Sequence, residues 1–127
     1  MLIRLGLAAF LLMPAAAQAA GSMDRMLAKL APEDRAHQAC AIKGLPIVKR
    51  DPRLRKADRI QSSTLGRAVL DGTHLAAKGG AVRVGQHWYA VSFTCDLTPD
   101  YMKAQNFSFV MGKEIPKENW DALGLWP

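Results

Sequence analysis

The sequence predicts an α+β fold in which N-terminal helices pack on a four- to five-stranded antiparallel sheet, followed by a short C-terminal helix. Before residue 45 the apolar side chains recur at helical spacing, whereas the most regular later stretch, residues 85–96, alternates every second residue. The chain of 127 residues holds two cysteines, Cys40 in the helical part and Cys95 in the alternating stretch. One disulfide that joins helix to sheet is therefore expected.

The first 19 residues have the pattern of a secretory signal peptide. Arg4 is followed by an apolar run at residues 5–13, and an A-x-A cleavage sequence stands at residues 17–19. The apolar run is too short to span a bilayer. We therefore expect a signal peptide at 1–19, a single disulfide-stapled domain at 20–127, and a periplasmic or secreted protein with no transmembrane segment in the mature chain. An oxidising compartment also favours disulfide formation.

Residues 22–30 are expected to form a short amphipathic helix, because their apolar side chains fall on one face. A second helix is expected to begin at Pro32, since proline is favoured in the first turn, and to end at Gly44 and Pro46. Small side chains on one face of this second helix allow close approach to the sheet, which brings the two cysteines together. The faces expected to meet the core are Met23, Met26, Leu27 and Leu30 in the first helix and Ala36, Ala39 and Cys40 in the second.

Strand candidates in the second half of the chain are separated by polar or glycine-containing turns. Gly85 and Gln86 suit a two-residue type II′ turn between the third and fourth candidates. Consecutive strands with short connections usually form a meander, so the last three candidates are expected to be neighbours. The candidates are residues 59–66, 73–77, 81–84, 87–96 and 105–112.

The central strand at residues 87–96 is predicted to have one buried face and one partly wet face. Its odd-numbered side chains are the larger apolar ones, and we assign them to the core. Trp88 lies on the opposite face, where a closing helix at residues 116–123 would cover it with Trp120. We interpret His87 as a structural histidine, not as a ligand. The side chains assigned to the core are His87, Tyr89, Val91, Phe93 and Cys95.

Residues 49–59 are the most basic stretch, with six Lys or Arg among 11 residues, in a chain of net charge +6. Such a stretch is either a solvated connecting loop or a site for an anion, namely a lipid head group, an acidic polysaccharide or a nucleic acid. Export argues against a nucleic-acid partner, and no aromatic residue interleaves the charges. An exposed Trp88 beside this stretch would favour the site. The candidate anion-binding residues are Lys49, Arg50, Arg53, Arg55, Lys56 and Arg59.

The sequence contains no recognisable catalytic, metal or cofactor motif. Its serines stand outside any G-x-S-x-G sequence. His37, His74 and His87 are far apart and follow no metal-ligand spacing. The glycines form neither a P-loop nor a dinucleotide-binding pattern. We therefore expect a protein that is not an enzyme and has no catalytic residue, metal or cofactor.

Four segments of the chain together resemble a known family. They are LAPEDRAHQAC, KADRI, AVRVGQHWYAVSFTCD and FSFVMGKEIPKENWDALGLWP, in which the W-Y-x-x-S-F-x-C strand and the I-P-x-x-x-W ending are the most specific parts. Over residues 26–127 the chain resembles the family catalogued as domain of unknown function number 930. The resemblance implies a small exported protein of a kind found mostly in alphaproteobacteria, with a pattern that includes both Cys40 and Cys95. It implies no activity and no catalytic residue.

These observations favour an exported, non-catalytic binding or envelope-associated protein. Its expected partner is an anionic envelope polymer or another envelope protein. The alternative is an inhibitor or immunity-type protein that acts on a secreted cell-wall hydrolase. A third hypothesis, an enzyme that acts on cell-wall sugar or lipid, requires paired carboxylates in a concave pocket.

Overall fold

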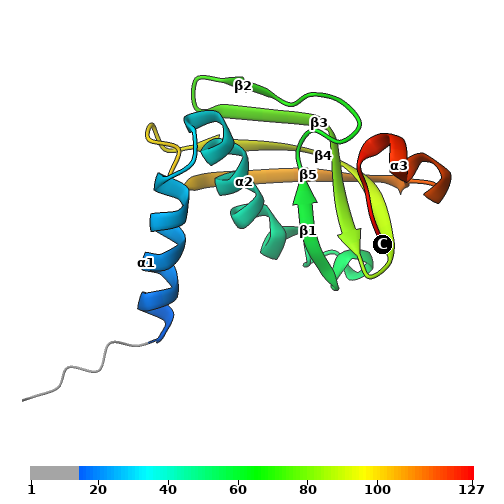
Figure 1. The fold of residues 1–127 in the computed structure, drawn as a ribbon, viewed down its shortest axis with the longest axis horizontal. Helices are drawn as coiled ribbons and strands as arrows, with labels where there is room; N and C mark the ends of the chain where they lie inside the picture. The colour runs from blue at the N-terminus through cyan, green and yellow to red at the C-terminus, as the bar shows by residue number, and fades with distance from the viewer. Residues whose placement is uncertain (1–14) are drawn as a thin grey trace, which may run out of the picture.

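Two helices, a five-stranded antiparallel sheet and a short C-terminal helix follow one another along the chain (Figure 1). The computed structural model describes the backbone of residues 15–127 and the side chains of residues 21–127. The predicted α+β class and the predicted order of its parts are confirmed. The elements are α1 (Ala15–Ala28), α2 (Pro32–Val48), the 3₁₀ turn η1 (Pro52–Leu54), β1 (Ala57–Gln61), β2 (Val69–Asp71), β3 (His74–Val84), β4 (His87–Leu97), β5 (Ala104–Glu114), the 3₁₀ turn η2 (Lys117–Asn119) and α3 (Trp120–Leu123).

Helix α1 projects away from the sheet, and in its described part it packs chiefly against the beginning of α2 (Figure 1). Of its apolar face, Leu27 is buried, whereas Met23 and Met26 are 42% and 50% exposed. The expectation that the methionines belong to the core is therefore wrong, because the helix projects beyond the sheet that would cover them. The predicted signal peptide, residues 1–19, lies largely outside the described residues, and α1 begins within it at Ala15.

Helix α2 begins at Pro32 as predicted but runs on to Val48, past the glycine and proline that were expected to end it. Gly44 is buried against β5, where a Cβ at this position would overlap the ring of Phe107. The glycine therefore serves close packing between helix and sheet. Pro46 lies on an exposed side of the helix, and its missing N–H costs a single intrahelical hydrogen bond.

The sheet has the strand order β1-β3-β4-β5, and β2 pairs with the first half of β3 on the same side as β1. The two strands expected at residues 73–77 and 81–84 are one strand, β3, interrupted by a bulge before Gly80. The loop after β1 crosses this bulge, and the backbone N–H groups of Thr64 and Leu65 donate to the Gly79 carbonyl. A side chain at Gly79 would overlap this loop, so the glycine permits the crossing. β1 consequently ends at residue 61, earlier than expected.

The turn between β3 and β4 is the predicted two-residue hairpin. Val84 pairs with His87, which leaves Gly85 and Gln86 as the loop. Gly85 has a φ of 61°, and Gln86 is not among the residues with positive φ. This combination fits a type II′ turn, in which only the first loop residue needs the conformation that glycine tolerates.

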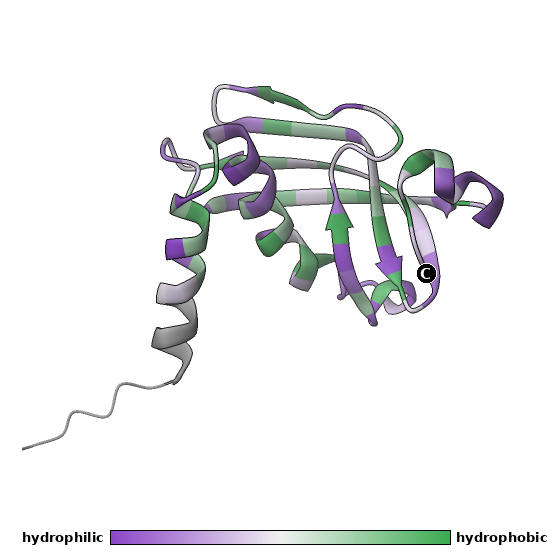
Figure 2. Cartoon of the chain, viewed as in Figure 1, coloured by the Kyte–Doolittle hydropathy of each residue, from purple (hydrophilic) through white to green (hydrophobic). Residues whose placement is uncertain are grey.

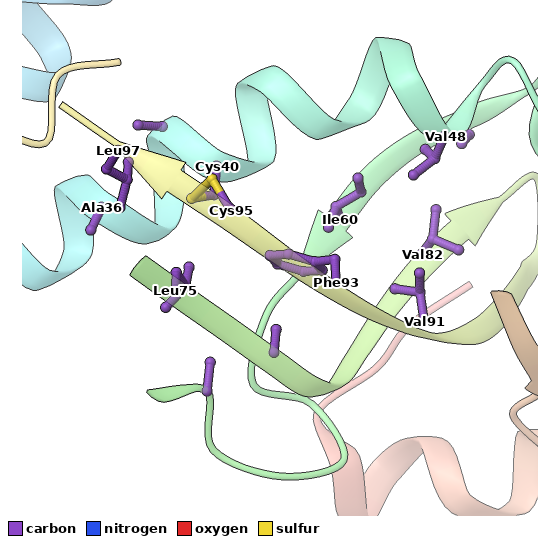
Figure 3. Close-up of a cluster of buried hydrophobic side chains, with 14 of the residues drawn as sticks. Ala36, Cys40, Val48, Ile60, Leu75, Val82, Val91, Phe93, Cys95 and Leu97 are labelled. Carbon is purple, nitrogen blue, oxygen red and sulfur yellow. A yellow bond between two sulfur atoms is a disulfide. The ribbon is translucent and has the colours of Figure 1, made fainter. Parts of the chain in front are cut away.

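The main core lies between α2 and one face of the sheet (Figure 3). Val91, Phe93 and Cys95 of β4 point into it, as the alternation predicts, and Tyr89 is half-buried at its margin. His87 is exposed, so its assignment to the core is wrong. It stands at the hairpin end of the sheet, where its Nδ1 lies 2.6 Å from the Glu114 carboxylate.

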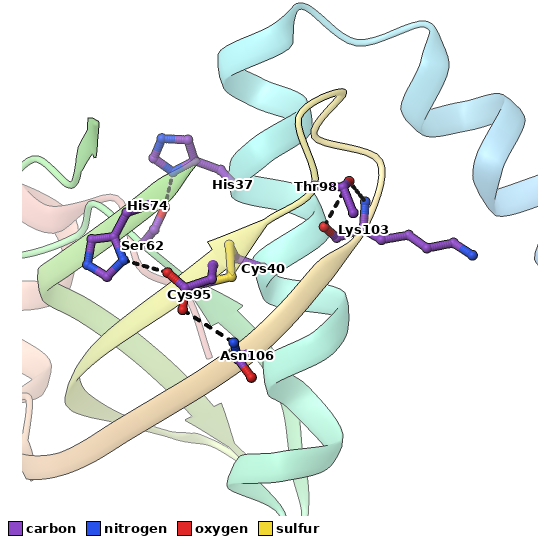
Figure 4. The surroundings of a disulfide bond; sticks show 9 residues. His37, Cys40, Ser62, His74, Cys95, Thr98, Lys103 and Asn106 are labelled. Carbon is purple, nitrogen blue, oxygen red and sulfur yellow. Dashed lines mark hydrogen bonds and ion pairs between the residues drawn. A yellow bond between two sulfur atoms is a disulfide. The ribbon is translucent and has the colours of Figure 1, made fainter. Parts of the chain in front are cut away.

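The disulfide between Cys40 and Cys95 joins α2 to the central strand, with the Cα atoms 6.0 Å apart (Figures 3 and 4). Both cysteines are buried, and neighbouring Ala36 and Ala39 on the same helix face are buried with them. The small side chains bring the helix close enough to β4 for the bond to form. The predicted pairing and the predicted position of the bond are confirmed.

A smaller apolar cluster covers the opposite face of the sheet near the hairpin. Trp88 is fully buried there against Ile115, Trp120 and Leu125. The closing helix thus covers Trp88, as expected if that side chain were buried. The expected helix at residues 116–123 is shorter, because η2 precedes α3.

Candidate anion-binding surface

The basic stretch at residues 49–59 forms the end of α2, the turn η1 and the start of β1. Leu54 is fully buried and anchors η1, so the charged neighbours point outward. The Asp51 carboxylate accepts hydrogen bonds from the Arg53 backbone and guanidinium, at 2.7–3.1 Å. These bonds hold the pKa of Asp51 below its usual value. Arg53 is therefore occupied in stabilising the turn.

The remaining five candidates are exposed, and within the described part of the chain none of them has a carboxylate within ion-pair distance. They do not form one site. Arg50 lines a hollow between α2 and β5, whereas Arg59 lies over the indole of Trp126 near the C-terminus. A basic patch beside an exposed Trp88, which would have favoured the site, does not exist, because Trp88 is buried. The five residues are Lys49, Arg50, Arg55, Lys56 and Arg59.

Arg59, Arg83 and Trp88 form a row across β1, β3 and β4, in which each residue pairs with the next. The C-terminal segment crosses this row and places Trp126 over it. The guanidinium carbons of Arg59 and Arg83 lie 5.2 Å and 5.5 Å from the centre of the Trp126 ring. We call Arg59, Arg83 and Trp126 the arginine–tryptophan surface. Figure 2 shows hydrophilic colour in part of β1 and at the adjoining end of β3.

Trp126 is held in place by its backbone. The indole Nε1 of Trp88 donates to the Trp126 carbonyl at 2.7 Å, and the Leu125 N–H donates to the Trp120 carbonyl at 2.9 Å. Leu125 is buried, and the two indole rings meet edge to face at 5.5 Å. The Trp126 side chain nevertheless remains 40% exposed. An aromatic ring is thus fixed at the surface beside two cations.

The two arginines differ in what already binds them. Arg83 makes a forked pair of bonds to the Asp58 carboxylate, at 2.9 Å and 2.8 Å, and its side chain is only 16% exposed. Hydrogen bonding from Arg83 lowers the pKa of Asp58, and the pKa of Arg83 is raised in turn. Arg59 is exposed and has no such carboxylate among the described residues. Arg59 is therefore the cation that a ligand at Trp126 would meet first.

Sequence reasoning missed Arg83 and Trp126. Arg83 stands in a predicted strand, and its register opposite Arg59 depends on a bulge between residues 57 and 59 that has no sequence signature. Trp126 follows the last periodic element, so no pattern gives it a position. A usable signal was the residue type itself, since tryptophan is enriched at interfaces, where one end is apolar and the N–H can find a partner.

Each of the three histidines has one polar partner. His37 on α2 is hydrogen-bonded to Ser62, and His74 Nδ1 lies 2.7 Å from the Asp96 carboxylate (Figure 4). Hydrogen bonding from His74 is the main reason that the pKa of Asp96 is lowered. Among the described residues, no three or more His, Cys, Asp and Glu side chains are placed to hold a metal ion. These pairs link neighbouring elements at the surface.

Comparison with known proteins gives one match. The model of the family described as Domain of Unknown Function (DUF930) matches residues 27–125. No curated protein matches the chain, and no solved structure matches it. Within the part of the chain that the structure describes, the helices fall short of the length and apolar character needed to cross a membrane.

Proposed function

The chain belongs to the DUF930 family, and we propose that it is an exported, non-catalytic binding protein whose ligand is an anionic polymer of the cell envelope. The observation that carries the proposal is the arginine–tryptophan surface, in which a fixed and exposed indole lies beside two guanidinium groups. A guanidinium matches the geometry of carboxylate and phosphate groups. The flat face of an indole offers apolar area with little conformational freedom to lose.

An acidic polysaccharide fits this chemistry best. Its carboxylates or phosphates would meet Arg59, and the apolar face of a sugar ring would lie on Trp126. The exposed cations of the basic stretch, Arg55 and Lys56, follow η1 directly and would add attraction along the polymer. The binding that we propose is therefore electrostatic at long range and aromatic at contact, and salt should weaken it.

Export is supported by the sequence pattern of residues 1–19 and by a disulfide, which persists in oxidising compartments. Cell fractionation tests this part of the proposal. Protein recovered from the periplasm or the medium should begin at or near Ala20. Intact protein confined to the cytoplasm would contradict it.

The binding is tested with polygalacturonate as the acidic polymer and dextran as the neutral one, by isothermal titration at low and high salt. Trp126→Ala is expected to weaken polygalacturonate binding by about fivefold or more, because exposed aromatic anchors carry a large share of interface energy. Arg59→Ser should weaken it as well. Arg67→Ser removes one exposed cation from the loop before β2 and serves as the matched control.

Two outcomes would contradict the proposal. One is equal binding of polygalacturonate and dextran, and the other is equal loss in the Arg59 and Arg67 variants. Because Trp126 also packs on Trp88, its variant is first compared with the unchanged protein by urea denaturation. The binding comparison uses only variants that are folded under the conditions of titration.

Asp58→Asn is expected to strengthen polygalacturonate binding by about threefold to tenfold, since it frees Arg83 from a forked ion pair that is partly exposed. The pH dependence of the affinity difference between this variant and the unchanged protein provides a check. The pKa of Asp58 is lowered in the fold, so the ion pair is present above the carboxylate's ordinary range and is lost as the pH falls through the lowered value. The affinity advantage of the variant should therefore shrink below about pH 4.

The matched control for this prediction is Asp24→Asn, which makes the same change in net charge on exposed α1. Titration of both variants against polygalacturonate at one salt concentration separates the local effect from the global one. Equal gains in the two variants would mean that net charge alone governs binding. No gain in the Asp58 variant would mean that Arg83 does not take part.

A further inference from the structure

The hollow that Arg50 lines, of about 340 Å³, lies between α2 and the beginning of β5. Its volume is within the range of small-molecule sites in proteins. The eight residues that line it are either apolar or cationic, and none is acidic. They are Ala39, Ile42, Lys43, Pro46, Ile47, Arg50, Lys103 and Ala104.

Helical spacing brings the α2 residues to this flank. Positions 39, 43, 46 and 50 recur every three or four residues and so follow one side of the helix. Ile42 and Ile47 are half-buried and form apolar walls with Ala104 of β5. The hollow therefore offers apolar surface, and removing this surface from water would favour binding of an apolar group.

The three cations stand at the rim. Lys43, Arg50 and Lys103 are exposed, and within the described residues no carboxylate lies at ion-pair distance from them. The acid next in sequence, Asp51, is already engaged by Arg53. The positive charge around the hollow is thus not neutralised by neighbouring acids.

Lys103 owes its position to the loop between β4 and β5. The Thr98 N–H donates to the Lys103 carbonyl at 2.8 Å, and the Lys103 N–H donates to the Thr98 hydroxyl at 3.2 Å. Figure 4 shows the lysine side chain extending away from the disulfide. The backbone at the mouth of the hollow is therefore fixed while the ammonium group stays free to meet a ligand.

From this arrangement we propose that the hollow binds a single alkyl chain that carries an anionic head, as in a fatty acid. The alkyl chain would cover Ile42, Ile47 and Ala104, and the head would lie among the three cations. A polysaccharide would leave the apolar walls uncovered, and a small anion would not need them. The proposal shares no residue with the arginine–tryptophan surface, so either site can fail without the other.

The test is a titration of the purified protein followed by amide NMR shifts, with decanoate kept below its micelle concentration. The expected result is a saturable change at Ile42, Ile47 and Ala104, with affinity that rises from hexanoate to decanoate. Acetate supplies the head alone, and decyltrimethylammonium supplies the chain with a cationic head. Both compounds should bind at least about tenfold more weakly than decanoate.

Reversing the charge of two rim residues tests whether the cations at the rim bind the anionic head. The double variant Lys43→Glu/Arg50→Glu is expected to weaken decanoate binding by about tenfold or more. Its matched control, Lys56→Glu/Lys113→Glu, reverses two exposed cations that do not line the hollow. All four positions are on the surface, so both variants should fold, and their NMR spectra report this directly.

The proposal is overturned by any of three results. Acetate or inorganic phosphate could produce the same shifts with the same affinity as decanoate, which would indicate a site for anions only. The cationic amphiphile could bind as well as decanoate, which would indicate apolar binding without charge selection. The two double variants could lose affinity equally, which would indicate a general effect of net charge.

Discussion

Replacing Cys40 with alanine is expected to lower the free energy of unfolding by about 2–5 kcal/mol. The bond closes a loop between residues that are 55 positions apart. The chain-entropy model gives about 4 kcal/mol for a loop of this length, through restriction of the unfolded chain. Domains of this size are stable by only about 5–15 kcal/mol in total. Urea denaturation of the variant and the unchanged protein at one pH measures the difference.

The double variant Cys40→Ala/Cys95→Ala separates the lost bond from the new free thiol. It should be destabilised to a similar extent, whereas only the single variant should form mixed disulfides or disulfide-linked dimers through Cys95. Alanine is preferred to serine because both positions are buried and a hydroxyl there would need a partner. Thiol titration of the denatured, unreduced protein should find no free thiol. Two free thiols would contradict the prediction.

The sheet and its disulfide could be predicted because both depend on local periodicity. The alternation of β4 places Cys95 on the core face, and the spacing of α2 places Cys40 on the face of small residues. Each pattern is short-range, and together they define where helix and sheet meet. The conditional expectation for Trp88 also followed, because alternation puts it opposite Cys95 and an apolar ending was available to cover it.

What could not be predicted depends on contacts between distant segments. Gly44 resembles a helix terminator in the sequence, and only the position of Phe107 shows that it serves packing. Gly79 likewise resembles a turn between two strands, although it lies in the bulge of one strand that a loop crosses. A glycine that ends an element and a glycine that permits close packing look the same in the sequence, so the sequence alone cannot distinguish these two roles.

The candidate site was predicted in part. The basic stretch identified Arg59 as a free cation, but it also grouped residues that the fold sends to different places. Composition reports the number of charges, whereas a binding surface depends on which charges share a neighbour. The aromatic residue considered for a place beside the stretch was Trp88, and the structure instead places Trp126 beside Arg59. The C-terminal crossing over the sheet decides between them, and no periodic pattern describes that crossing.

Trp88→Ala is expected to be the most destabilising substitution on the second face of the sheet, at about 3–5 kcal/mol. The side chain is fully buried against Ile115, Trp120 and Leu125, so its removal leaves a cavity among large neighbours. Its Nε1 also donates the hydrogen bond that holds the Trp126 carbonyl. Denaturation followed by far-UV circular dichroism measures the loss, since the variant also changes the tryptophan fluorescence. A change below about 1 kcal/mol would mean that the C-terminal segment is not packed on this face.

Trp88→Phe distinguishes the cavity from the hydrogen bond. Phenylalanine keeps most of the apolar contact but has no N–H, so the stability loss should fall to about 1–3 kcal/mol, the cost of leaving a partly buried carbonyl without its donor. Polygalacturonate binding should nevertheless fall, because Trp126 loses the bond that fixes it beside Arg59 and Arg83. A stability loss in that range, in a variant that remains folded, combined with weakened binding would show that Trp88 positions the surface as well as the fold. Unchanged binding in a folded Trp88→Phe variant would contradict that positioning role, because it would mean that Trp126 does not need the hydrogen bond.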